Sequence, residues 1–89
     1  MAVYLITYDL IDPGQDYDEL YDEIKDLADD YIHPCESNWF VKTELDPGEI
    51  VDKLYALDGT DKVIVMKVIT PWATEGLDKD DLDWLHENV

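Results

Sequence analysis

The sequence of 89 residues contains no arginine and only six lysines, against 23 aspartates and glutamates, so its formal net charge is −17. A surface this negative repels other polyanions, which argues against nucleic acid and anionic membranes as direct partners. It attracts basic protein surfaces, and such association is expected to be fast and sensitive to salt. The scarcity of positive charge therefore predicts a basic protein as the partner.

The chain also has little cysteine and no long hydrophobic run. Its single cysteine, Cys35, cannot form a disulfide within the chain, so nothing points to an oxidising compartment. No apolar stretch approaches the roughly 20 residues of a membrane-spanning helix, and the first residues lack the features of a signal peptide. We therefore expect a cytoplasmic protein without a membrane partner.

Aromatic and aliphatic residues, in contrast, are plentiful. Hydrophobic residues make up 46% of the chain, and they include three tryptophans and six tyrosines. A disordered acidic tail would contain few aromatic residues. A length of 89 residues fits one domain. The sequence therefore predicts a single folded domain over residues 1–89 that carries its acidic residues on the outside.

Four segments have the composition of β-strands. Residues 3–8 and 62–69 are continuous β-branched and apolar runs, typical of strands buried on both faces. The turn residues 12–14 end the first of them. Shorter strands are predicted at 31–35 and 37–43, and the proline in the first of these places it at a sheet edge.

Three helices are predicted between and after these strands. The first covers residues 17–31, where apolar residues repeat at helical spacing behind a capping box of Asp16 and Glu19. The second begins at Pro47 with Asp46 as its cap, and its apolar stripe is Ile50, Val51, Leu54 and Tyr55. A short terminal helix is predicted over about 78–88.

This order of elements favours an α+β fold of the ferredoxin-like type, a βαββαβ sandwich with an added C-terminal helix. Its helices would cover one face of the sheet and leave the other open. Tyr8, Trp39 and alternate residues of the last strand are expected on that open face. An exposed apolar face needs a partner, often a second copy of the chain. Because tryptophan is enriched at interfaces, Trp39 and Trp72 are the candidate interface residues.

Several short motifs resemble small SinR-type proteins of the CRISPR-associated Cas-two superfamily. They are Thr7-Tyr8-Asp9-Leu10 with the following residues 12–17, the segment 36–43, and Trp72-Ala73. The resemblance implies a ferredoxin-like fold and a symmetric homodimer. It also implies that Asp9 faces its counterpart across the dimer and holds a divalent metal such as Mg2+ for phosphodiester cleavage. Other members of the family are structural DNA-binding dimers. This chain departs from the nucleic-acid-binding members because it has no arginine.

The residues with catalytic chemistry form no complete set. Asp9 is either a metal ligand and general base or simply the turn residue after a strand. His33 and His86 stand in no recognised zinc spacing, and only one cysteine is present. Cys35 is expected to be a small buried hydrophobe rather than half of a nucleophilic Cys–His pair. The residues therefore favour a non-enzymatic protein without a cofactor.

One face of the first helix concentrates the acidic residues. Like charges three or four residues apart destabilise a helix, and aspartate is a poor helix former. The sequence accepts this cost at Asp18, Asp22, Glu23, Asp26, Asp29 and Asp30. One interpretation is that these carboxylates imitate the phosphates of a nucleic acid against a basic groove. The alternatives are solubility and adaptation to high salt.

Three functions follow from these observations. The first is a non-enzymatic DNA mimic that inhibits a basic nucleic-acid-binding protein of a defence system, as an anti-CRISPR protein does. The second is a metal-dependent endonuclease that uses Asp9. The third is a structural homodimer module. The charge of the chain favours the first.

Overall fold

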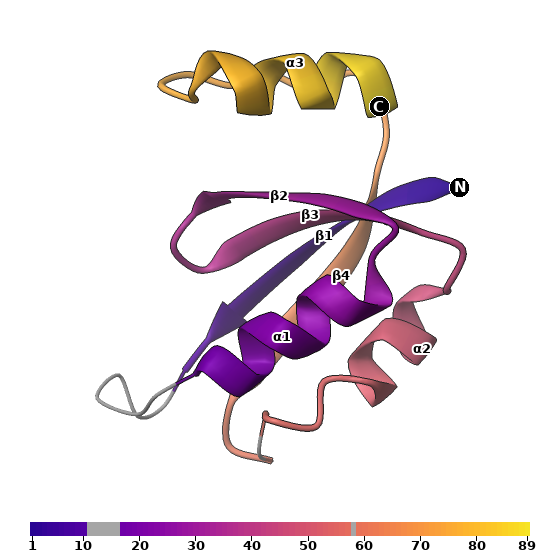
Figure 1. Cartoon of the computed structure of the whole chain (residues 1–89), viewed down its shortest axis with the longest axis vertical. Helices are drawn as coiled ribbons and strands as arrows, with labels where there is room; N and C mark the ends of the chain where they lie inside the picture. Colours follow the sequence, from indigo (N-terminus) through magenta and orange to yellow (C-terminus); the bar gives the residue numbers. More distant parts are fainter. Residues whose placement is uncertain (11–16, 58) are drawn as a thin grey trace.

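The structure is a computed structural model that describes residues 1–10, 17–57 and 59–89 (Figure 1). In this part of the chain, three helices and a four-stranded sheet form an α+β fold, as predicted. The elements in chain order are β1 (Ala2–Asp9), α1 (Asp18–Leu27), β2 (Asp30–Cys35), β3 (Asn38–Thr43), α2 (Pro47–Asp52), β4 (Lys62–Val68) and α3 (Lys79–Asn88). The predicted turn at residues 12–14 and the predicted cap Asp16 lie outside the described residues.

The sheet is antiparallel, with the strand order β2-β3-β1-β4. The central position predicted for the first strand is confirmed, because β1 pairs with β3 on one side and with β4 on the other. In this register Ile6 lies opposite both Trp39 and Val65. The edge position predicted for β2 is also confirmed. The whole arrangement is compatible with a ferredoxin-like fold.

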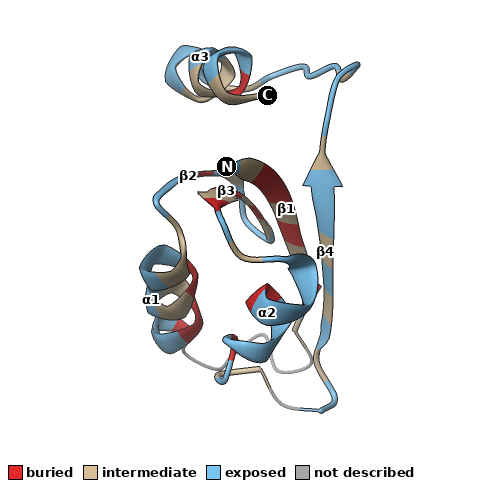
Figure 2. Ribbon diagram, turned by 90° about the vertical axis from the view of Figure 1, so that its right-hand side faces the viewer, coloured by how far each residue is buried: buried red, intermediate tan, exposed pale blue. Residues whose placement is uncertain are grey.

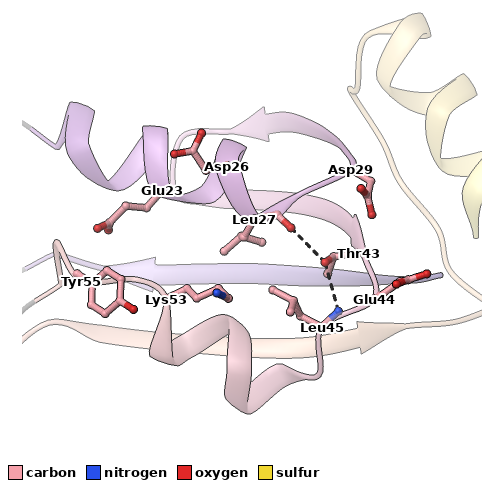
Figure 3. Close-up of a pocket in the computed structure, with 9 residues that line it drawn as sticks. All are labelled: Glu23, Asp26, Leu27, Asp29, Thr43, Glu44, Leu45, Lys53 and Tyr55. Carbon is pink, nitrogen blue, oxygen red and sulfur yellow. Dashed lines mark hydrogen bonds between the residues drawn. The ribbon is translucent and has the colours of Figure 1, made fainter.

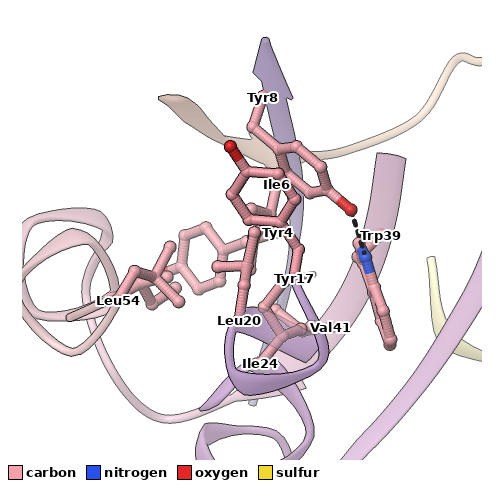
Figure 4. Close-up of a cluster of buried hydrophobic side chains, with 10 residues drawn as sticks. Tyr4, Ile6, Tyr8, Tyr17, Leu20, Ile24, Trp39, Val41 and Leu54 are labelled. Atoms are coloured by element: carbon pink, nitrogen blue, oxygen red, sulfur yellow. Dashed lines mark hydrogen bonds between the residues drawn. The ribbon is translucent and has the colours of Figure 1, made fainter. Parts of the chain in front are cut away.

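The main core lies between the sheet and the pair of helices α1 and α2 (Figures 2 and 4). Alternate side chains of β1 point into it, because successive residues of a strand face opposite sides of the sheet. Its buried members are Tyr4, Ile6, Tyr8, Tyr17, Leu20, Ile24, Trp39, Val41, Ile50 and Leu54. The prediction that Tyr8 and Trp39 lie on the opposite, open face is therefore wrong. Trp39 shares the core face because it pairs with the buried Ile6, and only 1% of it is exposed.

The first helix is shorter than predicted. It ends at Leu27, whereas the apolar periodicity continues to Tyr31. Ala28 already has extended backbone angles, and the Asp29 backbone N–H donates to the carbonyl of Lys42 at 2.8 Å. Hydrogen bonding to β3 thus draws the chain out of the helix, and the last residues of the periodic segment become β2.

The second helix begins as predicted but buries less of its surface. Asp46 Oδ1 accepts the backbone N–H of Glu49 at 2.8 Å, and Glu49 Oε1 accepts that of Asp46 at 3.2 Å, which confirms the capping box. Ile50 is fully buried. Val51 and Tyr55, predicted to belong to the same apolar stripe, are 41% and 79% exposed.

The terminal helix α3 lies on the other side of the sheet from α1 and α2, beside β2 (Figure 1). Two polar contacts hold it there. Trp84 Nε1 donates to Asp30 Oδ2 at 2.9 Å, and Lys42 Nζ donates to Asn88 Oδ1 at 2.9 Å. Leu85 is 2% exposed. The face of the sheet that was expected to be open is therefore partly covered by the chain itself.

The strand β4 is an edge strand, so the prediction that it is buried on both faces is wrong. Its Val63 and Val65 pack against the main core. On the opposite face Ile64 and Met66 are 56% and 58% exposed, and the following Ile69 is 65% exposed. Ile64 and Met66 therefore present apolar side chains to solvent on the same face of β4.

Candidate functional site

The acidic residues predicted to bind a partner start along α1. Asp18, Asp22 and Asp26 are exposed and follow one another at intervals of four residues, so they lie on one side of the helix. In the described part of the chain, the carboxylates of Asp22 and Asp26 make no hydrogen bond or ion pair with another residue. Their negative charge is directed to solvent rather than used within the fold.

The two aspartates predicted at the end of this helical face have different roles in the structure. Both lie beyond the end of α1, so the prediction that they belong to its helical face is wrong. Asp30 begins β2, and its carboxylate accepts hydrogen bonds from the Tyr31 backbone N–H and from the Trp84 indole. Asp30 is therefore occupied in holding α3. Asp29 remains exposed and lies with the α1 carboxylates at the mouth of a groove.

This groove is a cavity of about 530 Å3 between α1 and α2 (Figure 3). We call it the α1–α2 groove. It is lined by Glu23, Asp26, Leu27, Asp29, Thr43, Glu44, Leu45, Lys53 and Tyr55. Its volume lies within the range of roughly 300–1,000 Å3 typical of ligand sites in proteins. The lining combines four carboxylates and one ammonium group with an apolar floor of two leucines.

Side chains of the groove also hold its walls in place. Glu23 Oε1 accepts the backbone N–H of Ala56 at 2.8 Å, which ties the segment after α2 to α1. At the inner end, Thr43 Oγ1 donates to the carbonyl of Leu27 at 3.1 Å and accepts the N–H of Leu45 at 3.3 Å (Figure 3). The first two bonds link the three chain segments that line the groove, and the third lies within the segment 43–45. Its shape is therefore fixed by the fold.

Sequence reasoning found only part of this groove. Glu23, Asp26 and Asp29 were predicted as partner-binding residues, whereas Glu44 and Lys53 were not singled out. The lining comes from residues 23–29, 43–45 and 53–55, which are distant in sequence. The one usable signal is that Glu44 directly follows a predicted strand, where a polar side chain is exposed at the end of the sheet.

Asp9 does not form a metal site within the chain. It is exposed at the end of β1, and its partner across the ladder to β4 is Lys62. Together with Thr7, Tyr8 and Ile64 these two residues line a hollow of about 170 Å3. Across residues 1–10, 17–57 and 59–89, no three His, Cys, Asp or Glu side chains are grouped to hold a metal. The described residues of one chain thus supply no such ligand group, and the Mg2+ site that the Cas-two resemblance implies between two chains stays a prediction.

The histidine and cysteine near Pro34 also form no catalytic pair. His33 stacks on Trp39 with ring centroids 3.9 Å apart, and its Nε2 donates to the carbonyl of Glu36 at 3.1 Å. The prediction that Cys35 is buried is wrong, because its thiol is exposed. Cys35 is the last residue of the edge strand β2, and the β2–β3 pairing is irregular between Ile32 and Cys35.

The two predicted interface tryptophans lie in different surroundings. Trp39 is enclosed in the core, where its Nε1–H donates to the Tyr8 hydroxyl at 3.1 Å (Figure 4). Its indole is thus committed to the fold. Trp72 is partly exposed and contacts the His86 ring, with centroids 4.9 Å apart. Of the two residues, Trp72 alone presents aromatic surface to a partner.

Comparisons with known proteins identified no relative of this chain. No protein-family model matches the sequence, no curated protein matches it, and no solved structure matches the fold. Among the residues that the structure describes, no helix has the length and hydrophobicity needed to cross a membrane. The candidate site therefore rests on its geometry and charge.

Proposed function

We propose that this protein is a non-enzymatic, acidic binding protein whose α1 side imitates nucleic acid and occupies a basic nucleic-acid-binding protein. The partner would be a component of a defence complex of the CRISPR type, which the protein would inhibit by excluding DNA or RNA. We also propose that the fold is ferredoxin-like and related to the SinR-type group. The element order, the antiparallel sheet and the short motifs support that part of the proposal.

The observation that supports the proposed function is a group of exposed carboxylates beside the α1–α2 groove. The carboxylates of Asp22, Asp26 and Asp29 are exposed and have no hydrogen-bond or ion-pair partner within the described residues. The helix α1 gains nothing from Asp22 and Asp26, because like charges four residues apart oppose helix formation. A basic groove that normally binds phosphates would supply the missing counter-charges and would associate rapidly.

The test is competition for a defined partner. Purified basic nucleic-acid-binding proteins from bacterial defence complexes are loaded with labelled DNA, and the release of label is measured as this protein is added. We expect release that weakens as NaCl is raised, because both binding events depend on charge. The triple variant Asp22→Lys, Asp26→Lys and Asp29→Lys should abolish release while its circular dichroism spectrum is unchanged.

A matched control separates a specific surface from net charge. The variant Asp80→Lys, Asp81→Lys and Glu87→Lys changes the charge by the same amount on α3 and should still release DNA. Equal loss in both variants, or no release by the wild-type protein from any partner in the panel, would overturn the proposal. Metal-dependent cleavage of RNA or DNA that disappears in Asp9→Ala would overturn it in favour of the nuclease alternative.

A structural homodimer is the second candidate, and the exposed residues of β4 favour it. Ile64 and Met66 are more than half exposed on an edge strand, where an unpaired backbone can accept another strand. A dimer formed there would leave the acidic α1 side free. Sedimentation equilibrium of the wild type and of the variant Ile64→Lys with Met66→Lys tests this candidate. A wild type that stays monomeric at all concentrations would exclude it.

A further inference from the structure

The sheet carries a continuous row of apolar residues on the face opposite the main core. Ile6 of β1 enters the main core, so its neighbour Leu5 faces the other side. Leu5 lies opposite Phe40 of β3 and opposite Met66 of β4. Phe40 in turn lies opposite Ile32 of β2. Residues directly opposite each other in antiparallel strands share a face. The row, which we call the outer apolar row, therefore crosses all four strands.

The helix α3 covers only one end of the outer apolar row. It lies beside β2, and its one buried residue is Leu85 (Figure 1). Exposure along the row increases with distance from β2. Ile32 is 9% exposed, Phe40 and Leu5 are partly buried, and Met66 is 58% exposed. The covered and the exposed parts of the row thus form one apolar surface that α3 divides.

Few interactions hold α3 in this position. It has ten residues, and an isolated helix of that length is marginal in water. Its N-cap residue, Asp78, makes no side-chain capping hydrogen bond. Residues 69–78, which join β4 to α3, are all described and none of them is buried (Figure 2). A cavity of about 430 Å3 is lined by residues of β1, β4 and the end of α3. The helix can therefore leave the sheet without disturbing strand pairing or the main core.

The charges on this face of the sheet cancel. Asp9 lies opposite Lys62, and Asp30 lies opposite Lys42. The strands therefore present a formally neutral face in a chain whose net charge is −17. A neutral face offers a basic protein no attraction, but it is a place where two copies of this chain can meet with little repulsion. Docked α3 changes this balance, because it brings four acidic residues and one lysine to the same side.

We infer that α3 is an autoinhibitory cover that keeps the outer apolar row from binding a second copy of the chain. Docked α3 blocks part of the row and repels the second copy by its acidic charge. Once α3 is released, the whole row is available and two copies associate through it. The apparent affinity of the dimer is then set by the fraction of molecules with α3 released. This inference goes beyond the proposed function, because the acidic residues of α1 lie on the other side of the sheet and take no part in it.

The test weakens the docking of α3 in the full chain by the substitution Leu85→Ala. Hydrogen exchange of the α3 amides, followed by NMR, measures docking, and sedimentation equilibrium at constant salt measures the dimer dissociation constant. We expect the α3 amides to lose protection and the dimer to become about tenfold tighter than in the wild type. Amide shifts that depend on protein concentration should be centred on Leu5 and Phe40.

Three further variants assign the effect to the cover. Leu54→Ala also removes a buried leucine, but from the main core on the other side of the sheet, so the dimer should not become tighter. Leu85→Ala combined with Ile64→Lys and Met66→Lys places charge on the opened face and should abolish the dimer. Trp84→Phe removes only the hydrogen bond to Asp30 and should tighten the dimer about threefold. It provides the test if circular dichroism shows that Leu85→Ala does not fold.

Several results would overturn the inference. They are full protection of α3 in Leu85→Ala, loss of protection with an unchanged dissociation constant, equal tightening by Leu54→Ala, and open-ended aggregates in place of a dimer. A wild type that dimerises as tightly as Leu85→Ala would reject the cover and retain the homodimer candidate. The release of DNA from a basic partner is measured separately, so its failure rejects the proposed function and leaves the cover in place.

Discussion

Replacing Tyr8 by phenylalanine removes one oxygen atom from the main core. That oxygen accepts the Trp39 Nε1–H at 3.1 Å and donates to the carbonyl of Glu36 at 3.3 Å. Trp39 is 1% exposed, so in the variant its N–H has neither this acceptor nor access to water. An unsatisfied buried donor costs about 1–3 kcal/mol. We expect Tyr8→Phe to lower the free energy of unfolding by that amount at pH 7.

The same substitution changes the dependence of stability on pH. Burial raises the pKa of Tyr8 to about 12, although the hydrogen bond from Trp39 favours the ionised form. A tyrosine in the unfolded chain has a pKa near 10. As pH rises from about 10 to about 12, the unfolded chain therefore loses this proton before the folded protein does, and stability falls. A pKa difference of two units corresponds to about 2.7 kcal/mol of the free energy of unfolding. The Tyr8→Phe variant has no hydroxyl at this position, so it does not lose this stability as pH rises.

Urea unfolding followed by circular dichroism, at several values between pH 7 and pH 12, measures both effects. The free energy of unfolding of the wild type minus that of Tyr8→Phe should be constant up to about pH 10 and then decline by about 2–3 kcal/mol. Charge repulsion common to both proteins cancels in this difference. Tyr55→Phe removes an exposed hydroxyl and should change stability by less than about 0.5 kcal/mol at pH 7. A difference between wild type and Tyr8→Phe that is zero at pH 7, or flat up to pH 12, would refute the reasoning.

Three further predictions follow from the charge, the second helix and the thiol. Because the net charge is −17, added NaCl or MgCl2 should raise the melting temperature by screening self-repulsion, and an unchanged thermal melt would contradict this. Asp46→Ala should lower stability by about 1 kcal/mol through loss of the capping box, measured by urea unfolding beside the exposed control Asp52→Ala. Cys35 should react with Ellman's reagent in the folded protein as fast as in urea, and protection in the folded state would show that the thiol is covered.

Local patterns predicted most of the elements of this fold. The cap at Asp46, the central first strand and the edge strand β2 all follow from short stretches of sequence. The predictions are wrong where contacts between segments distant in the sequence determine the structure. The chain leaves α1 after Leu27 because Asp29 bonds to β3, and no local signal announces that bond. Ile64 belongs to an apolar run that is typical of a buried strand, but the strand order places β4 at the edge of the sheet and leaves Ile64 exposed.

The candidate site shows the same division between local and distant information. The acidic residues of α1 can be identified from the sequence, and Asp22 and Asp26 lie on the side of the helix that their spacing predicts. The α1–α2 groove could not be predicted, because its walls are brought together by contacts between segments distant in sequence, among them the bonds of Glu23 and Thr43 to remote backbone. Helical periodicity also assigned Tyr55 to the core, although α2 ends before it and leaves its ring exposed.

The aromatic cluster around Trp39 has a practical consequence for spectroscopy. Its indole lies against Tyr21, Tyr31 and His33, so its fluorescence emission should be blue-shifted and modulated by the histidine stacked on it. Trp84 bonds to Asp30 on the far side of the sheet and should emit at longer wavelength. Single-tryptophan versions of the protein would thus let an observer watch the central packing and the docking of the terminal helix as two separate optical signals.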